Sequence, residues 1–401
     1  MGHRMKKVLF VVPKYKNVWE PLGISYIAAY CNKHYKDDLI MGVLNLNFNH
    51  LNYDYLRSFD IVAFTSTTPT YPQCLEIAKN LPDTHTVLGG WHATATPQTI
   101  HIAFDQVVIG EGEVPFLKIL YGNRNRFISG RPLAFEHLPW PNRELIGQEQ
   151  MLDLCEDICG ERITALQSRR GCSHSCTFCS EKLMSSNNVR VRDPDDVLDE
   201  LEEIAKNYNI TSFKFLDPTW AHPRRAVIDF CNAKIQRRNT IPFEANAHIA
   251  YMDQYMLQLA KKAGCNQLNF GVESGSQKLL NDMKKGVTVQ KIKDVFKWAK
   301  LERIGRRAFF ILGMPNETEE TIEETRELIR EIQPSVVGFT MLCPYPSTQY
   351  WQDRYEGTDF STMDEYSNNL INSKQLSNQD LKDIQKSLNE EFYDILVEHK
   401  K

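Results

Sequence analysis

Short apolar runs alternate with amphipathic stretches along the first 125 residues of this 401-residue chain. Residues 23–34 and 71–80 carry apolar side chains at helical spacing. The runs between them are continuously apolar, as in strands buried on both faces, and span 7–12, 39–46, 60–65, 86–90 and 106–110. The pattern predicts an α/β fold, a doubly wound Rossmann-like domain over 1–125, with its ligand at the carboxyl ends of parallel strands.

The alternation resumes between residues 161 and 350 as six strand–helix units. Asp193 and Pro194 begin the first of these helices, because aspartate is a favoured N-cap and proline suits the first helical position. The expected strands span 163–168, 212–216, 243–249, 267–272, 308–312 and 336–342. Six such units predict a partial (β/α)6 TIM-type barrel, with its chemistry at the carboxyl ends of the strands.

Two stretches fall outside this alternation. Residues 126–160 are expected to be a linker, because prolines interrupt 138–142 and disfavour regular structure. Residues 351–401 are expected to be a C-terminal helical extension. Apolar residues at helical spacing there predict one amphipathic helix over 379–398, packed on the barrel.

Composition narrows the class of protein. The net charge of -4 gives no basic footprint, so no nucleic-acid partner is expected. No run of 18 apolar residues exists, which argues against a membrane span, and the N-terminal residues lead directly into a strand instead of a signal peptide. Ten cysteines, three of them closely spaced, indicate metal binding in a reducing compartment, so a cytoplasmic location is expected.

Cys172, Cys176 and Cys179 follow the first predicted barrel strand. Four-iron clusters are normally held by four thiolates, so three leave one iron open, and open metal positions are where chemistry takes place. A structural zinc site is the alternative, but it needs a fourth ligand, and His174 is too close to its neighbours to complete a tetrahedron. Two further thiols at 155 and 159 are too few for a second cluster and are read as a coincidence.

This triad, with Phe178 before its third cysteine, resembles the radical S-adenosylmethionine (SAM) superfamily. The resemblance implies a [4Fe-4S] cluster whose open iron binds SAM, an external electron donor such as flavodoxin or ferredoxin, and cleavage of SAM to a 5'-deoxyadenosyl radical. Residues 271–276 and 310–315 resemble family segments that lie near the nucleoside. Packing and turn-forming roles remain alternatives for them. The expected SAM-contacting residues are Phe178, Asp217, Glu273, Ser274, Ile311 and Gly313.

Three glycine-containing segments in the first half, 21–29, 89–94 and 109–113, resemble the cobalamin-binding domain fused to many radical SAM enzymes. Glycine allows the backbone to pass close to a large planar ring. The expected cobalamin contacts are Gly23, Ser66, Thr67, Gly89, Gly90, His92, Gly110, Glu111 and Gly112. The Asp-x-His-x-x-Gly signature that supplies a histidine to cobalt is absent. Cobalamin binding and its loss therefore both remain open, and His92 is either near the ring or an ordinary strand-end histidine.

The resemblance as a whole implies a cobalamin-dependent radical SAM protein of the class B methyltransferase-like subgroup. Its reaction would be methylation of an unactivated carbon in a small-molecule or natural-product-like substrate. The substrate is expected to face Trp220, His222 and Tyr345. One alternative is a radical rearrangement, cyclisation or oxidation with a degenerate cobalamin domain. The other is a non-catalytic iron–sulfur protein, although such a protein would usually close its cluster with a fourth ligand.

Overall fold

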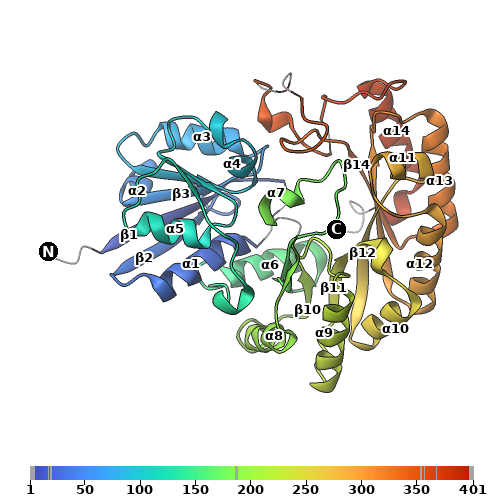
Figure 1. The fold of residues 1–401 in the computed structure, drawn as a ribbon, viewed down its shortest axis with the longest axis horizontal. Helices are drawn as coiled ribbons and strands as arrows, with labels where there is room; N and C mark the ends of the chain where they lie inside the picture. The colour runs from blue at the N-terminus through green and yellow to red at the C-terminus, as the bar shows by residue number, and fades with distance from the viewer. Residues whose placement is uncertain are drawn as a thin grey trace.

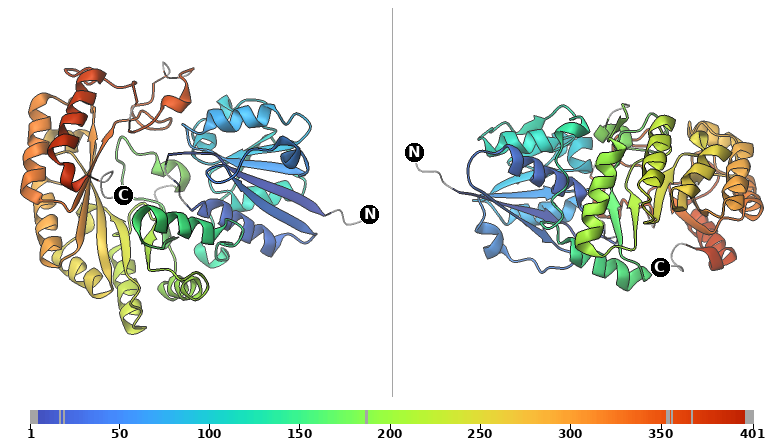
Figure 2. Two further views of the ribbon diagram at one scale, coloured as in Figure 1. Left: turned by 180° about the vertical axis from the view of Figure 1, so that it is seen from behind. Right: turned by 90° about the horizontal axis from the view of Figure 1, so that it is seen from below.

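The computed structural model describes residues 5–16, 18, 20–185, 188–352, 355, 357–366 and 368–396. Two α/β units lie side by side along the longest axis of the molecule (Figure 1). The same two units lie at opposite ends of the molecule and adjoin each other when seen from behind and from below (Figure 2). None of the helices in the described ranges is both long and apolar enough to cross a membrane.

The N-terminal unit is a parallel six-stranded sheet with helices on both faces. The strand order β2-β1-β3-β4-β5-β6 changes direction beside β1, as in doubly wound sheets. The strands are β1 (Lys6–Val12), β2 (Leu39–Asn45), β3 (Ile61–Thr65), β4 (His85–Gly89), β5 (Gln106–Ile109) and β6 (Phe127–Ser129). The helices are α1 (Leu22–His34), α2 (Tyr53–Arg57), α3 (Tyr71–Lys79), α4 (Trp91–Ala95) and α5 (Glu113–Leu120).

Two separate apolar clusters cover the two faces of this sheet. On one face Ile24 of α1 and Phe116 of α5 pack against Phe10 of β1. On the other face Cys74 and Ile77 of α3 belong to a second cluster. Because both faces are covered, the strands are mainly apolar, and the order and parallel pairing of the strands confirm the predicted doubly wound architecture.

The second unit is a parallel sheet of six consecutive strands with helices outside. The order β14-β13-β12-β11-β10-β7 leaves β7 and β14 as edges, so this sheet is the predicted partial barrel. The strands are β7 (Ile163–Leu166), β10 (Ser212–Phe215), β11 (Phe243–Ala247), β12 (Cys265–Glu273), β13 (Gly305–Leu312) and β14 (Val336–Met341). The helices are α8 (Pro194–Tyr208), α9 (Arg224–Gln236), α10 (Gln254–Lys262), α11 (Gln277–Asp282), α12 (Val289–Leu301) and α13 (Glu319–Ile332).

The stretch expected to be a linker contains regular structure. β6 pairs with β5 and extends the N-terminal sheet, with Ile128 buried beneath it. α6 (Gln148–Cys159) follows and ends at Gly160 in the left-handed conformation. The prolines confine the irregular part to the residues between β6 and α6, where the 3-10 turn η2 (Phe135–His137) is the only regular element described.

The C-terminal helix is shorter than the 379–398 predicted. α14 (Asn378–Glu391) starts at a capping box between Ser377 and Asp380 and packs against β14, as expected. The chain then makes the 3-10 turn η6 (Tyr393–Ile395), and Leu396 bridges to Val337 on the free edge of β14. Unpaired backbone groups at a sheet edge accept such an addition, which ends the helix early. Residues 397 and 398 lie outside the described residues.

Buried ion pairs join the two units. Arg143 lies between Glu20 of the N-terminal unit, at 3.2 Å, and Glu200 of α8, at 2.6 Å. Glu20 also accepts a hydrogen bond from the Ala165 amide of β7 at 3.1 Å. These side chains are nearly inaccessible to solvent, and breaking a buried pair leaves an uncompensated charge. The interface therefore holds the two units in a fixed relation.

Candidate active site

The cysteine loop leaves the carboxyl end of β7 and is closed by a short antiparallel pair, β8 (Arg169–Arg170) with β9 (Arg190–Val191). Gly171 has φ +98°, and a Cβ there would lie 2.4 Å from the Asn188 carbonyl oxygen, so the loop requires glycine. The Thr177 amide donates to Met283 at 3.0 Å, and its hydroxyl lies 2.7 Å from the Tyr350 hydroxyl. Contacts from α11 and from the C-terminal segment therefore hold the loop.

The three cysteines face one cavity of about 280 Å³, here called the cluster cavity. Within the described ranges, no three His, Cys, Asp or Glu side chains gather around a single metal-ion position. A four-iron cluster does not require such a gathering, because each of its thiolates binds a different iron. The donor set thus fits a cluster with one open iron. Residues lining the cavity besides the cysteines include Phe178, Glu273, Lys285, His248, Asn246, Asn269 and Gly271.

A buried ion pair forms one wall of the cluster cavity. The Lys285 ammonium lies 2.7 Å from the Glu273 carboxylate, and both side chains are less than 10% exposed. Burial alone would lower the pKa of Lys285, but Glu273, Cys176 and Cys179 together outweigh it and the pKa is raised. A Cβ on Gly271 would lie 2.2 Å from Glu273 Oε1 and 2.9 Å from Lys285 Nζ. The glycine of the predicted segment therefore makes room for this pair. Lys285 itself was not predicted.

Two histidines stack beside this pair. The rings of His174 and His248 lie 3.6 Å apart with an interplanar angle of 11°. His248 Nδ1 accepts from the Ala250 amide at 3.3 Å, which assigns the ring proton to Nε2. The Nε2 atoms of both rings are buried without a partner among the described residues. Burial, with Lys285 as a second cause, lowers the pKa of His248 to about 2, so the ring is neutral. A buried donor beside a cavity can be satisfied by water or by a ligand that enters the cavity.

Asp217 does not line the cluster cavity, contrary to expectation. Its carboxylate is completely buried and accepts hydrogen bonds from the Ser168 amide at 2.8 Å and the Arg169 amide at 3.1 Å. It also lies 3.3 Å from the Arg169 guanidinium. The predicted position of Asp217 at the end of a strand is correct. Its side chain, however, points toward Ser168 and Arg169 and stabilises the chain just before the cysteine loop.

Ser274, Ile311 and Gly313 also lie outside the lining of the cluster cavity. The Ser274 hydroxyl accepts from the Ser276 amide at 3.1 Å, which is the turn-forming role left open above. Ile311 packs against the barrel core. Gly313 has φ +95°, and a Cβ there would lie 3.0 Å from Ile371 of the C-terminal segment. The close approach at this glycine is thus to the chain itself.

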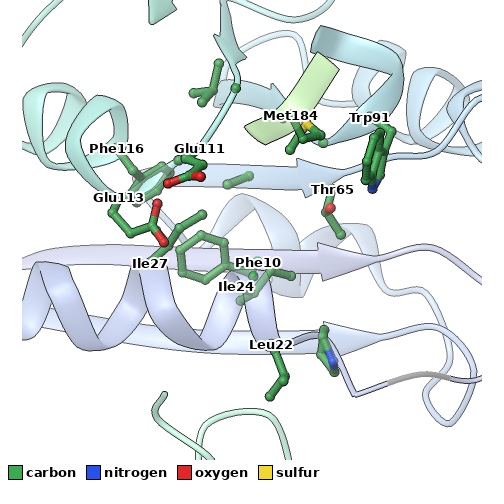
Figure 3. A pocket seen from close by; sticks show the side chains of 18 of the residues that line it. Phe10, Leu22, Ile24, Ile27, Thr65, Trp91, Glu111, Glu113, Phe116 and Met184 are labelled. Carbon is green, nitrogen blue, oxygen red and sulfur yellow. The ribbon is translucent and has the colours of Figure 1, made fainter. Parts of the chain in front are cut away.

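A second cavity, of about 500 Å³, lies in the N-terminal unit and is here called the N-terminal cavity. Figure 3 shows Phe10, Ile24 and Ile27 grouped on its inner side, with Trp91 and Met184 toward the arrowheads of the strands. Six of the nine glycines and polar residues predicted for cobalamin line it: Gly23, Gly89, Gly90, Gly110, Glu111 and Gly112.

Close backbone approach explains two of these glycines. Gly90 has φ +96°, and a Cβ there would lie 2.6 Å from the Ser66 carbonyl oxygen. A Cβ on Gly112 would lie 2.5 Å from Ile27 Cδ1 on α1. Glu111 is bound to the second unit, because its carboxylate pairs with Arg170 at 3.1 Å and with Arg190.

Three predicted cobalamin contacts do not line the N-terminal cavity. Ser66 is buried with its amide bonded to Gly89, and Thr67 lines a third cavity described below. His92 is fully buried, stacked on Tyr71 at 4.2 Å with Phe360 at its edge. Burial lowers the pKa of His92 to about 4. His92 therefore lies on α4 and packs inside the N-terminal unit, outside the lining of the N-terminal cavity.

Other residues singled out from the sequence lie elsewhere. Trp220 is fully buried and stacks against Phe215, so it does not face a substrate. His222 stacks on Tyr251 at 4.3 Å. The sulfurs of Cys155 and Cys159 lie 3.6 Å apart on α6, and neither lines the cluster cavity.

The two cavities adjoin at the short helix α7 (Glu181–Ser185), which follows the third cysteine. Glu181 and Pro218 line both cavities, and Met184 of α7 lines the N-terminal cavity. The sequence places the cysteines and the glycine segments in different domains. Only the fold brings them to opposite sides of one helical turn.

Two family models match the chain, one to each unit. Residues 8–120 match the B12 binding domain, and residues 166–329 match the Radical SAM superfamily. The chain belongs to the radical SAM superfamily, in the subgroup that carries a B12-binding domain. It is an enzyme of this family.

Relatives cover most of the chain. An uncharacterised methyltransferase of Pyrococcus horikoshii is 27% identical over 87% of this chain and 83% of its own length. An anaerobic magnesium-protoporphyrin IX monomethyl ester cyclase of Rubrivivax gelatinosus is 28% identical over 88% of this chain and 71% of its own. Among solved structures, the radical SAM methyltransferase TsrM from Kitasatospora setae, with cobalamin and a [4Fe-4S] cluster bound, has a TM-score of 0.71 at 18% identity. That match covers 86% of this chain and 74% of TsrM.

Proposed function

We propose that this enzyme uses SAM and cobalamin to methylate an unactivated carbon of a small molecule. One observation carries the proposal: the cysteine-lined cavity and the glycine-lined cavity share Glu181 and Pro218. A substrate at α7 would lie within reach of cofactors held on both sides. When bound, the cluster with SAM supplies a 5'-deoxyadenosyl radical that removes a hydrogen atom from the substrate, and methylcobalamin supplies the methyl group.

The cluster cavity offers a matched set of groups for SAM. Cys172, Cys176 and Cys179 would hold three irons. Glu273 and Lys285 form a carboxylate–ammonium pair, which is complementary to the ammonium and carboxylate of a methionyl group. The unpartnered Nε2–H of His248 would donate to an acceptor of the same ligand. These groups are buried, so their interactions with SAM would be little screened by water.

The N-terminal cavity offers a largely apolar space for cobalamin. Gly90 and Gly112 line it at positions where a Cβ would meet Ser66 and Ile27, and Phe10 is one of its apolar lining residues. At the end near the barrel, Arg170 is fixed by Glu113 at 2.8 Å and by Glu111. This end would hold polar edges of a corrin in place and keep water from α7.

We propose that the enzyme takes its electron from an external donor such as flavodoxin or ferredoxin, and that it acts without a nucleic-acid partner.

The proposed reaction is tested by anaerobic reconstitution with iron, sulfide and hydroxocobalamin, followed by SAM and a chemical reductant. We expect about one corrin per chain, together with 5'-deoxyadenosine and S-adenosylhomocysteine. Absence of 5'-deoxyadenosine, with an intact cluster, would refute the radical assignment.

A second candidate is radical cyclisation or oxidation without methyl transfer. It is favoured by the resemblance to the magnesium-protoporphyrin IX monomethyl ester cyclase, which matches as much of the chain as the methyltransferase relative does. The same experiment separates the two reactions. Formation of 5'-deoxyadenosine without S-adenosylhomocysteine, in protein loaded with cobalamin, would select the second candidate.

A further inference from the structure

A third cavity, of about 220 Å³, lies where three parts of the chain meet. The N-terminal unit contributes the loops after β1 and β3 and helix α4, the segment after Cys179 contributes Ser180 and Leu183, and the C-terminal segment contributes Tyr345, Pro346 and Glu365. The remaining lining residues are Tyr15, Thr67, Thr68, Pro69, Trp91 and Ala95.

The third cavity adjoins the N-terminal cavity and begins one residue along the chain from the cluster cavity. Trp91 lines the third cavity and the N-terminal cavity alike. Ser180 directly follows Cys179 of the cluster cavity, and Leu183 lies on α7 between them. A molecule in the third cavity is therefore next to α7, where the proposed reaction takes place.

The C-terminal segment closes this cavity from the far side. Asp364 pairs with Lys16 of the N-terminal unit, and the ring of Phe360 meets the edge of His92 at 4.9 Å. The turn η5 (Phe360–Thr362) lies against α3. These contacts anchor the segment that carries Glu365 instead of leaving that carboxyl in open solvent.

The charged side chains among the described residues that line the third cavity are acidic only. Glu365 is the single carboxyl among the described residues that line it, and that set contains no Lys, Arg or His. The Tyr345 hydroxyl donates to Glu365 Oε2 at 2.8 Å. The nearby ammonium of Lys16 is paired with Asp364. Among the described residues Glu365 thus has a hydrogen bond but no ion pair, although the nearby Lys16 charge acts on its pKa.

The titration of these groups agrees with an unmatched acidic site. Burial and, to a smaller extent, the Asp364 charge raise the pKa of Glu365, and together they outweigh the Tyr345 hydrogen bond and the Lys16 charge, which lower it. Burial, followed by the Glu365 charge, raises the pKa of both Tyr15 and Tyr345. A cation bound beside a partly buried carboxylate offsets part of the desolvation cost of that carboxylate through their mutual attraction.

We propose that the third cavity binds the protonated amino group of the substrate, with Glu365 as its counter-ion. This inference rests on the proposed function and adds the substrate class, which is a small primary amine. The aromatic rings of Tyr15, Trp91 and Tyr345 suit the same ligand, because cations are attracted to aromatic faces. Each water molecule in the liquid takes up roughly 30 Å³. A cavity of about 220 Å³ therefore has room for a small organic group.

The test compares two probes of equal shape, 2-phenylethylamine and the neutral 2-phenylethanol. Their dissociation constants are measured by calorimetry on anaerobically reconstituted protein carrying both cofactors. We expect the amine to bind at least about tenfold more tightly, equivalent to about 1.4 kcal/mol. In Glu365→Gln this preference should fall to about one. Equal binding of the two probes, no binding of either, or a preference that survives Glu365→Gln would each refute the proposal.

Two further variants separate charge from packing. Asp359→Asn changes an exposed carboxylate in the same segment that caps η5, and asparagine caps equally well, so the amine preference should persist. Tyr345→Phe keeps the Glu365 carboxyl but removes a donor that lowers its pKa, so the preference should persist most clearly at the highest pH at which the amine stays protonated. Loss of the preference in Asp359→Asn, or in Tyr345→Phe at that pH, would contradict the assignment of Glu365.

Probe binding is measured without turnover, so it fails independently of the proposed function. An amine preference without any 5'-deoxyadenosine would leave the amine site intact and overturn the radical reaction. Formation of 5'-deoxyadenosine without an amine preference would overturn only the amine site.

Discussion

The N-terminal cavity and the cluster cavity adjoin at α7 but are lined by different kinds of residue. The first has glycines and apolar side chains such as Phe10, Ile24 and Phe116 around most of its space. The second has three thiols, the Lys285–Glu273 pair and the unpartnered ring nitrogen of His248. One cavity would select its ligand by shape, and the other by charge and hydrogen bonding.

This difference determines how each cavity tolerates change. Added volume should damage the glycine-lined cavity, while removal of a charged or ligating group should damage the cluster cavity. Four predictions test the contrast, beginning with the largest effect.

Cys176→Ala should abolish formation of 5'-deoxyadenosine, because a cluster ligand is lost. Bound iron should fall, while cobalamin binding in the other unit should stay at the wild-type level. Iron analysis and visible spectra measure the two cofactors separately. Cys155→Ala on α6 is the matched control and should behave as wild type. Normal iron content and activity in Cys176→Ala would rule out the cluster assignment.

Lys285→Met should destabilise the protein by about 3–5 kcal/mol, because it leaves the Glu273 carboxylate buried without a partner. Urea unfolding of protein without cofactors measures this change. The neighbouring Lys284 is exposed, so Lys284→Met should change the free energy of unfolding by only about 0.5 kcal/mol. Similar effects of the two variants would show that the buried pair is not what stabilises this wall.

Stability should depend on pH in opposite directions in the two units. Burial raises the pKa of Glu317, beneath β13, from 4.5 to about 7, so the folded state holds this proton more tightly. Stability is then lost as pH rises through that window. The pKa of His92 falls from 6.5 to about 4, so its contribution is lost as pH falls from 6.5. Each effect is about 3 kcal/mol at 1.36 kcal/mol per pKa unit.

Urea unfolding between pH 4 and 8 measures these slopes. Glu317→Gln should remove the loss of stability toward pH 7, and His92→Phe should remove the loss toward pH 4. A slope unchanged by its own variant would show that the buried group named here is not responsible for it.

Gly90→Ala should cost about 1–3 kcal/mol through backbone strain and the contact with Ser66, and should weaken cobalamin binding without lowering iron content. Gly122→Ala is the control. It has a similar φ of +90° but no atom within 4 Å of the added Cβ, so it should lose stability alone, by roughly 1–2 kcal/mol. Full cobalamin binding by Gly90→Ala would remove the argument that shape selects the ligand there.

The same contrast explains which features were predictable. Apolar periodicity located nearly every strand, and glycine segments and cysteine spacing carry their signal in neighbouring residues. β6 is only three residues long, too short for a periodic pattern, and was missed. Lys285 lies in a Lys-Lys-Gly turn that resembles ordinary surface, so its burial against Glu273 depends on contacts between distant elements.

The misplaced site residues share one cause. Asp217, Ser274 and Gly313 were correctly expected near the carboxyl ends of strands, but a motif does not fix the direction of a side chain. The Asp217 carboxylate accepts hydrogen bonds from Ser168 and therefore points away from the cluster cavity. At Gly313 the side chain of Ile371 fills the neighbouring space. The ring of His92 stacks on Tyr71 and therefore packs inside the N-terminal unit.

The most direct test of the account is the magnetic interaction between the two cofactors. Protein loaded with both is reduced so that the cluster and cobalt(II) are each paramagnetic, and the electron paramagnetic resonance spectrum is compared with that of Cys176→Ala. Because the two cavities share Glu181 and Pro218, the account predicts a cobalt signal that is split or broadened only when the cluster is present. Two independent, unperturbed signals in the doubly loaded protein would contradict it.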